Sequence, residues 1–136
     1  MRKSQTHKTS KGEEIARQII ETIFGAPFPS TYPPWLPTPA GARLQLDGYN
    51  ATLNIAFEYQ GTQHYQPFAP YTPNYVAAQQ LRDEHKARIC HQRGVTLITI
   101  PTFERHWTHE DRRLAIEVAI IHAGLGQHLK PREETP

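Results

Sequence analysis

The segment LQLDGYNATLNIAFEYQGTQHY, residues 44–65, combines two strand patterns with polar groups at their ends. The two predicted strands are residues 43–49 (RLQLDGY) and 53–61 (LNIAFEYQG). The second strand is mostly apolar, yet it contains Glu58, and Asp47 lies near the end of the first strand. If the two strands pair, both carboxylates converge on one edge of the sheet.

Two neighbouring carboxylates suggest a metal site. Asp47 and Glu58, with the backbone carbonyl of Tyr59, form a set of oxygen donors of the kind that Mg²⁺ prefers. Such a site can bridge a phosphate and activate a water for in-line attack. A structural alternative is also open, in which Asp47 serves a turn with Gly48 and Glu58 forms a buried salt bridge.

Polar residues follow the second strand at once. Gly61 allows backbone or substrate to approach closely. Gln63 and His64 then place an amide and a titratable imidazole beside the predicted metal. His64 is therefore a candidate to bind metal, orient water or protonate a leaving oxygen.

The order of predicted elements is helix, two strands, helix, strand, helix, which indicates a small α/β domain with a mixed sheet flanked by helices. Ser10 and Thr108 are predicted N-caps, and Gly25 and Gly94 predict helix ends. The proline-rich segment 26–41 predicts an extended wrap pinned by Phe28, Tyr32 and Trp35. The predicted helices span residues 11–24, 74–93 and 109–122, the third strand spans 95–100, and the turn between the first two strands spans 49–52.

The second predicted helix has two stripes at helical spacing. Ala78, Leu81 and Ile89 form an apolar stripe that we expect to face the core. The other stripe is either a solvated face with local ion pairs or, through Asp83 and Lys86, the rim of the metal site. Its members are Gln79, Asp83, Lys86 and Cys90.

The length of 136 residues fits a single domain, predicted over residues 11–125 between a basic arm (1–10) and a flexible tail (126–136). A single cysteine excludes an internal disulfide and fits a reducing compartment. No zinc-ligand spacing, membrane-length apolar run or secretory signal is present. The sequence thus predicts an intracellular protein with no membrane partner, located in the cytoplasm or nucleoid, or in the host cell if a phage or virus encodes it.

Six blocks in order resemble the restriction-endonuclease-like, or PD-(D/E)xK, superfamily. The most similar branch is the EDxHD group of phage and viral endonucleases, related to very-short-patch-repair and homing endonucleases. The resemblance covers roughly residues 10–103. The blocks are SKGE, PPWL, LDGYN, IAFEYQGTQHY, RDEHK and GVTLITIP.

This resemblance implies a restriction-endonuclease-like core and roles for particular residues. Glu13 matches the acid of the first helix, Asp47 the strand acid, His64 the histidine after the glycine turn, and Asp83 the acid of the later helix. Glu58 matches the acid of the Glu-x-Lys pair. In that pair the lysine position is occupied here by Gln60, which can bind water or phosphate but has no positive charge.

Three solutions to the missing lysine are open, in this order: His64 replaces it, Lys86 reaches in from its helix, or activity is lost. We expect Glu13 and Asp83 to orient His64 or a metal-bound water. Gln60 is expected to position water or phosphate. Expected contacts to the DNA backbone come from Lys8, Lys11, Gln63, Arg82 and Lys86.

The predicted function is therefore a Mg²⁺-dependent endonuclease, with Mn²⁺ as a substitute, acting on duplex, mismatched, nicked or branched DNA as a monomer or homodimer. Alternatives of the same fold are a Holliday junction resolvase and an inactive DNA-binding module. A structural domain, in which the acids only cap turns, belongs to a different class.

Overall fold

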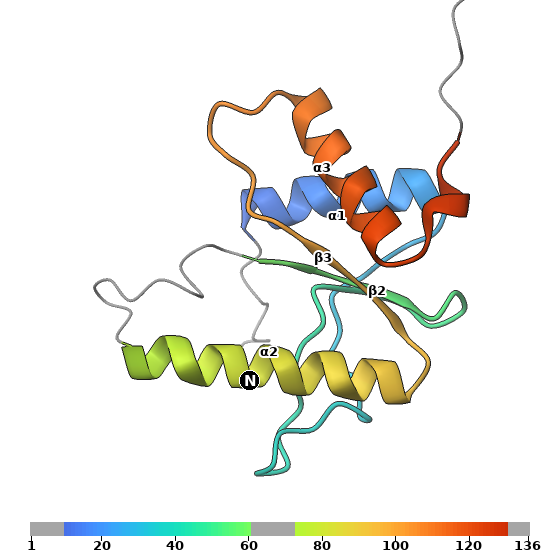
Figure 1. The fold of residues 1–136 in the computed structure, drawn as a ribbon. Coiled ribbons are helices and arrows are strands. Elements are labelled where there is room, and N and C mark those ends of the chain that lie inside the picture. Colours follow the sequence, from blue (N-terminus) through green and yellow to red (C-terminus); the bar gives the residue numbers. More distant parts are fainter. Residues whose placement is uncertain (1–9, 61–72, 131–136) are drawn as a thin grey trace, which may run out of the picture.

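The computed structural model describes residues 10–60 and 73–130. Strand β2 is central, with β1 antiparallel on one side and β3 parallel on the other (Figure 1). The predicted α/β class with a small mixed sheet is confirmed. In chain order the elements are α1 (Lys11–Phe24), β1 (Gly48–Asn50), β2 (Ile55–Tyr59), α2 (Pro73–Gln92), β3 (Thr96–Ile100), α3 (His109–His122) and a 3₁₀ helix, η2 (Gly126–His128).

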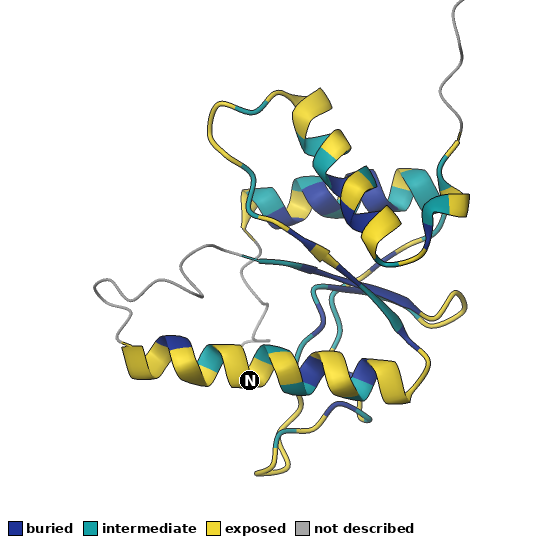
Figure 2. Cartoon of the chain, viewed as in Figure 1, coloured by how far each residue is buried: buried dark blue, intermediate teal, exposed yellow. Residues whose placement is uncertain are grey.

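The helices form two layers around this sheet. Helices α1 and α3 cover one face, and α2 lies across the other (Figure 1). The larger core cluster joins α1 and α3 to the sheet, and the smaller one includes Leu36, Leu46 and Cys90 under α2. Figure 2 shows the buried residues where the helices meet the sheet, with most of α2 exposed.

The first strand differs from its prediction. Only Gly48–Asn50 form β1, and before it single bridges join Leu46 to Thr31 and Arg43 to Pro37. The chain pairs there with the proline-rich segment, which cannot support a continuous ladder. Gly48 packs so closely on Phe57 that a Cβ atom would collide with the aromatic ring. The turn spans residues 51–54, two residues later than predicted.

The proline-rich segment is a wrap, as predicted, but only two of its three expected anchors contact the core. Phe28 is fully buried, and Trp35 packs edge-on against Tyr49. Tyr32 is 47% exposed, so the prediction that it pins this segment was wrong. Leu36, which was not predicted, is fully buried instead.

The predicted helix caps are confirmed. The Ser10 hydroxyl accepts a hydrogen bond from the Glu13 N–H at 3.1 Å, and Thr108 forms a reciprocal capping box with Asp111. Gly25 and Gly94 have positive φ angles, as helix ends require. The fold continues beyond the predicted end of the domain, because Leu129 packs against the core.

The orientation of α2 differs from the prediction at two of the three residues expected in the core, whereas Ile89 packs against the smaller core cluster as expected. Leu81, expected in the core, is 67% exposed, and Ala78 is also exposed. The polar stripe faces the sheet instead, where Lys86 and Cys90 are buried. The physical reason is Glu58, whose buried carboxylate attracts the one lysine on this helix.

Candidate active site

The predicted pair of carboxylates lies where β1 begins and β2 ends. Gly48 is opposite Phe57 in the β1–β2 register, which brings Asp47 next to Glu58. The Asp47 N–H donates to Glu58 Oε2 at 2.8 Å. The Tyr59 N–H donates to Asp47 Oδ2, also at 2.8 Å. Backbone hydrogen bonds therefore fix both carboxylates in place.

Lys86 completes this cluster from α2. Its Nζ donates to Glu58 Oε1 at 2.5 Å, and both side chains are about nine-tenths buried. A buried pair of this kind loses much solvation, so it is weak evidence for a purely stabilising role. The structural alternative for Glu58, a buried salt bridge, is therefore confirmed, and the role of Lys86 in a missing-lysine site stays a prediction.

The environment of the cluster changes the ionisation of Glu58. Burial raises its pKa to about 7, and the negative charge of Asp47 acts in the same direction. The Lys86 ammonium opposes both effects. Cys90 lies one helical turn beyond Lys86, and burial raises the pKa of its thiol to about 11. The Cys90 thiol is buried, and a buried thiol with a raised pKa is a poor nucleophile.

Arg17 was not predicted, yet it links three parts of the site. Its Nη1 donates to the Asp47 carbonyl at 2.8 Å and to the Phe28 carbonyl at 2.5 Å. Its Nη2 forms an ion pair with Glu13 at 3.0 Å. The available signal was an arginine four residues after Glu13, one turn along the helix.

Glu13 contacts Arg17, which in turn donates to the Asp47 carbonyl, and its predicted role in orienting His64 or a water stays a prediction. It is buried, and its carboxylate is bound to Arg17. Asp83 is half-buried on the stripe that includes Lys86, and the Gln79 amide donates to it at 3.4 Å.

Gln60 continues the chain directly after β2. Its N–H donates to the Ile100 carbonyl at 2.9 Å, and its own carbonyl accepts a hydrogen bond from the Thr102 hydroxyl. Three further predicted site residues lie outside the described residues, so nothing tests them. They are Lys8, Gln63 and His64.

The positively charged residues predicted to contact DNA differ in exposure. Lys11 and Arg82 are exposed, and Arg82 donates to Gln79 at 2.9 Å. Lys86 is buried and directed at Glu58. It therefore belongs to the carboxylate cluster rather than to an outer surface.

Within residues 10–60 and 73–130, no group of three or more histidine, cysteine, aspartate or glutamate side chains has the geometry of a metal site. The cluster offers two carboxylates. That number fits Mg²⁺, which commonly uses one or two protein carboxylates together with substrate phosphates and waters. Over the same ranges, no helix is both long enough and apolar enough to cross a membrane.

These features define an α/β domain with a buried carboxylate–lysine cluster at the end of its central strand. Comparison with known proteins then relates the chain to uncharacterized proteins of viruses. "Uncharacterized protein 033L" of Invertebrate iridescent virus 3 is 43% identical over 95 residues, which is 68% of this chain and 49% of the viral protein.

Two further relatives come from similar sources. "Uncharacterized protein 307L" of Invertebrate iridescent virus 6 is 33% identical, covering 69% of this chain and 57% of that protein. "Uncharacterized protein 094L" of Frog virus 3 is 33% identical, covering 71% and 65%. The chain thus spans between about half and two thirds of these relatives. No family model and no solved structure matches it.

Proposed function

We propose that this chain is a Mg²⁺-dependent endonuclease that hydrolyses DNA phosphodiester bonds. The observation that supports this proposal best is the 2.5 Å contact between Lys86 Nζ and Glu58 Oε1, next to Asp47. The PD-(D/E)xK resemblance implies two acids and a lysine around one phosphate. In this chain the lysine comes from α2, and Gln60 occupies the usual lysine position.

The donor set suits Mg²⁺. Asp47 and Glu58 provide hard oxygen ligands, and the Tyr59 carbonyl is a further candidate. Burial and the negative charge of Asp47 together raise the pKa of Glu58. The positive charge already in the site is therefore too small to stabilise both carboxylates in their ionised form. When bound, Mg²⁺ would polarise the phosphate and increase the acidity of a water.

The residues of the chain would divide the remaining work. Lys86 acts as a point charge that neutralises a phosphate oxygen, which is the usual role of lysine at phosphates. Gln60 can donate to a phosphate or orient a water. Arg17 positions Asp47 through its backbone carbonyl. His64 remains our candidate for proton transfer.

Docking of DNA would depend on charge rather than on base recognition. Arg82 and Lys11 are exposed and can contact backbone phosphates. Lys8 and Gln63 remain predictions of the same kind. Such contacts make affinity sensitive to salt, with little preference for sequence.

The test is cleavage of plain, mismatched, nicked and four-way-junction DNA with and without Mg²⁺. We expect Asp47→Asn, Glu58→Gln and Lys86→Ala each to reduce cleavage by roughly 100-fold or more. Lys130→Ala, which removes an exposed lysine outside the cluster, should cleave normally. A preference for four-way junctions would identify a resolvase.

A rescue variant tests the placement of the lysine. Gln60→Lys restores the strand lysine of the motif, so Lys86→Ala combined with Gln60→Lys should recover part of the activity. Thermal unfolding of each variant separates loss of chemistry from loss of fold. Metal-dependent cleavage that persists in Asp47→Asn and Glu58→Gln would contradict the proposal. DNA binding without cleavage in Mg²⁺ or Mn²⁺ would identify an inactive binding module.

A further inference from the structure

Strand β3 lies at an open edge of the sheet. In the part of the chain that the structure describes, β3 pairs only with β2. The Thr96 N–H donates to Asn54, and the Ile100 carbonyl accepts a bond from the residue after β2. Since backbone groups alternate in direction along a strand, Leu97 and Thr99 direct theirs to the open edge.

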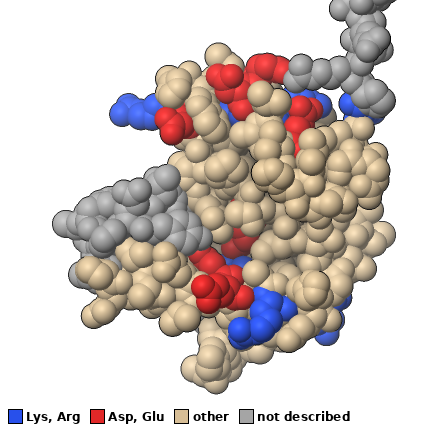
Figure 3. All heavy atoms as spheres, viewed as in Figure 1, with Lys and Arg blue, Asp and Glu red and all other residues tan. Residues whose placement is uncertain are grey.

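This edge lacks the features that usually prevent pairing. Soluble proteins protect open edges with charged residues, prolines or bulges. The five residues of β3, Thr96–Ile100, contain no charge and no proline. Figure 3 shows a wide area without charged side chains across the middle of this face, with acidic and basic groups at its margins.

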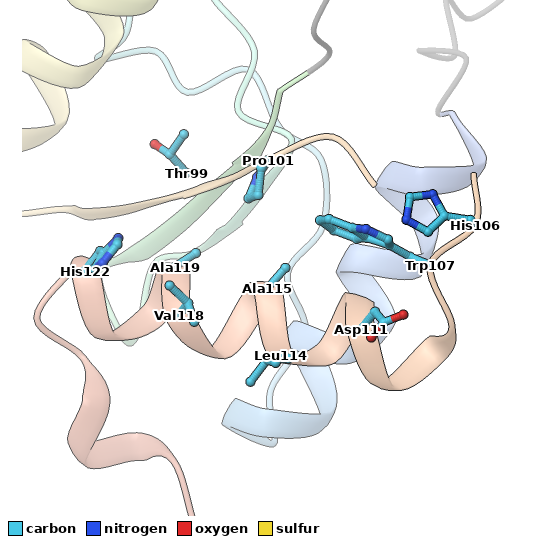
Figure 4. Close-up of a pocket in the computed structure, with 10 residues that line it drawn as sticks. All are labelled: Thr99, Pro101, His106, Trp107, Asp111, Leu114, Ala115, Val118, Ala119 and His122. Carbon is cyan, nitrogen blue, oxygen red and sulfur yellow. The ribbon is translucent and has the colours of Figure 1, made fainter. Parts of the chain in front are cut away.

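A hollow of about 610 Å³ lies beside the edge, between β3 and α3. Figure 4 shows Thr99 and Pro101 on the strand side and one side of α3 opposite them. The α3 residues that line it include a row with helical spacing of four, three and four residues. This row is Asp111, Ala115, Val118 and His122.

Helix α3 also exposes apolar surface next to the hollow. Leu114, Val118 and Ile121 are 47%, 42% and 55% exposed, although the opposite face of α3 is buried against the core. A helix that is apolar on both faces is normally covered on both. The hollow and the open strand edge therefore form one surface, which we call the β3–α3 surface.

We propose that the β3–α3 surface binds the same surface of a second copy of this chain, across a two-fold axis near Ile98. Antiparallel pairing of the two β3 edges would pair Leu97 with the partner's Thr99 and Thr99 with the partner's Leu97. These are the residues whose backbone groups point outward, so the pairing forms four hydrogen bonds. The two three-stranded sheets become one continuous sheet.

The α3 row is complementary to the same row of the second copy when the two are related by this axis. A two-fold axis makes the two α3 helices antiparallel, so that Asp111 lies near the partner's His122 and Ala115 lies against the partner's Val118. An acidic group thus meets a basic one at each end, and a small residue meets a larger one between them. This match favours a second copy over an unrelated apolar partner.

The dimer is independent of the endonuclease proposal. Asp47, Glu58 and Lys86 lie between β1, β2 and α2, whereas the β3–α3 surface lies at the opposite edge of the sheet. A variant that separates the two copies should therefore leave the carboxylate–lysine cluster intact.

Sedimentation equilibrium of the 136-residue chain tests the proposal. We expect a mass twice the 15.6 kDa of one chain. Thr99→Pro removes an outward N–H that β2 does not use, and Val118→Glu places a charge in the interface. Each should weaken dimerisation by roughly 100-fold. Leu81→Glu, at an apolar residue exposed on α2, is the matched control and should remain dimeric.

A charge test addresses the orientation. His122→Asp should weaken the dimer because it faces the partner's Asp111, whereas His122→Lys should preserve it. Matching thermal unfolding curves would show that the variants fold. A chain that sediments as a monomer at all concentrations would overturn the proposal. So would a dimer that survives both Thr99→Pro and Val118→Glu.

Discussion

The Glu58 carboxylate contacts two separate parts of the chain, Lys86 through Oε1 and the Asp47 N–H through Oε2. These contacts require an acceptor at both oxygens, which explains why an acid interrupts an otherwise apolar strand. Its removal from water is offset only in part, because the pKa of Glu58 remains raised despite Lys86. The buried pair as a whole is costly to the fold, but replacing Glu58 alone would leave the Lys86 ammonium buried without this partner.

This raised pKa predicts a pH dependence of stability. Glu58 has a pKa of about 7 in the folded protein and an ordinary value of 4.5, so folding takes up a proton between these values. The free energy of unfolding should therefore fall as pH rises from about 4.5 to about 7, by up to roughly 3 kcal/mol. Denaturant titrations of wild type and Glu58→Gln across this range measure the difference.

Glu104→Gln, which neutralises an exposed glutamate, is the control and should retain the wild-type slope. If Glu58→Gln shows the same slope as the wild type, burial does not raise the pKa of Glu58.

Helix α3 depends on its first turn. Thr108 accepts a hydrogen bond from the Asp111 N–H at 3.1 Å, and the Asp111 carboxylate accepts one from the Thr108 N–H at 2.9 Å. These two bonds satisfy backbone donors that the helix itself leaves unpaired. This cap fixes the residue at which α3 begins, and with it the position of α3 against β3 and α1.

We expect Thr108→Ala to lower the free energy of unfolding by about 1 kcal/mol, as loss of an N-cap usually does. Thr22→Ala is the matched control, since Thr22 is exposed within α1 and bonds only the carbonyl one turn earlier. Urea unfolding of both variants gives the comparison. Equal effects at the two positions would show that the cap contributes nothing.

Local signals predicted the helices well, because caps and glycines act within one turn. Ser10, Thr108, Gly25 and Gly94 all have their expected roles. The face of α2 was predicted wrongly at Ala78 and Leu81, since ranking side chains by polarity cannot anticipate that Lys86 pairs with a buried acid.

Only part of the candidate site was predictable, because only some of its contacts join residues that are close in sequence. Asp47 and Glu58 are close in sequence and meet through one antiparallel register. Arg17 and Lys86 arrive from separate helices, and only tertiary packing brings them to the acids. Helical spacing made Lys86 a candidate for the rim of the site, but spacing alone does not give its contact with Glu58 or the contact of Arg17 with Asp47.

At the scale of the whole molecule, three layers contribute to one cluster. Arg17 comes from the α1 layer, the two acids from the sheet, and Lys86 from α2 on the other face. A ligand that binds the acids should therefore stabilise the fold as a unit, since it binds only the assembled state.

Mg²⁺ should raise the melting temperature of the wild type. At about 100 times its dissociation constant, it should add about 2.7 kcal/mol to the free energy of unfolding. The affinity should increase as pH rises through about 7, because Glu58 must lose its proton to bind metal. Scanning calorimetry with and without Mg²⁺ tests this, and an equal shift in Asp47→Asn would place the metal elsewhere.

The sheet register also affects the order in which contacts form during folding. The β1–β2 turn brings Asp47 and Glu58 together early, since it joins neighbours in sequence. Lys86 comes from α2, further along the chain, so its contact with Glu58 closes a longer loop than the β1–β2 turn does. Until then two like charges face each other in the growing structure. Refolding, followed by the fluorescence of Trp35 against Tyr49, should therefore be faster in Glu58→Gln, which removes one of the two charges, than in the wild type.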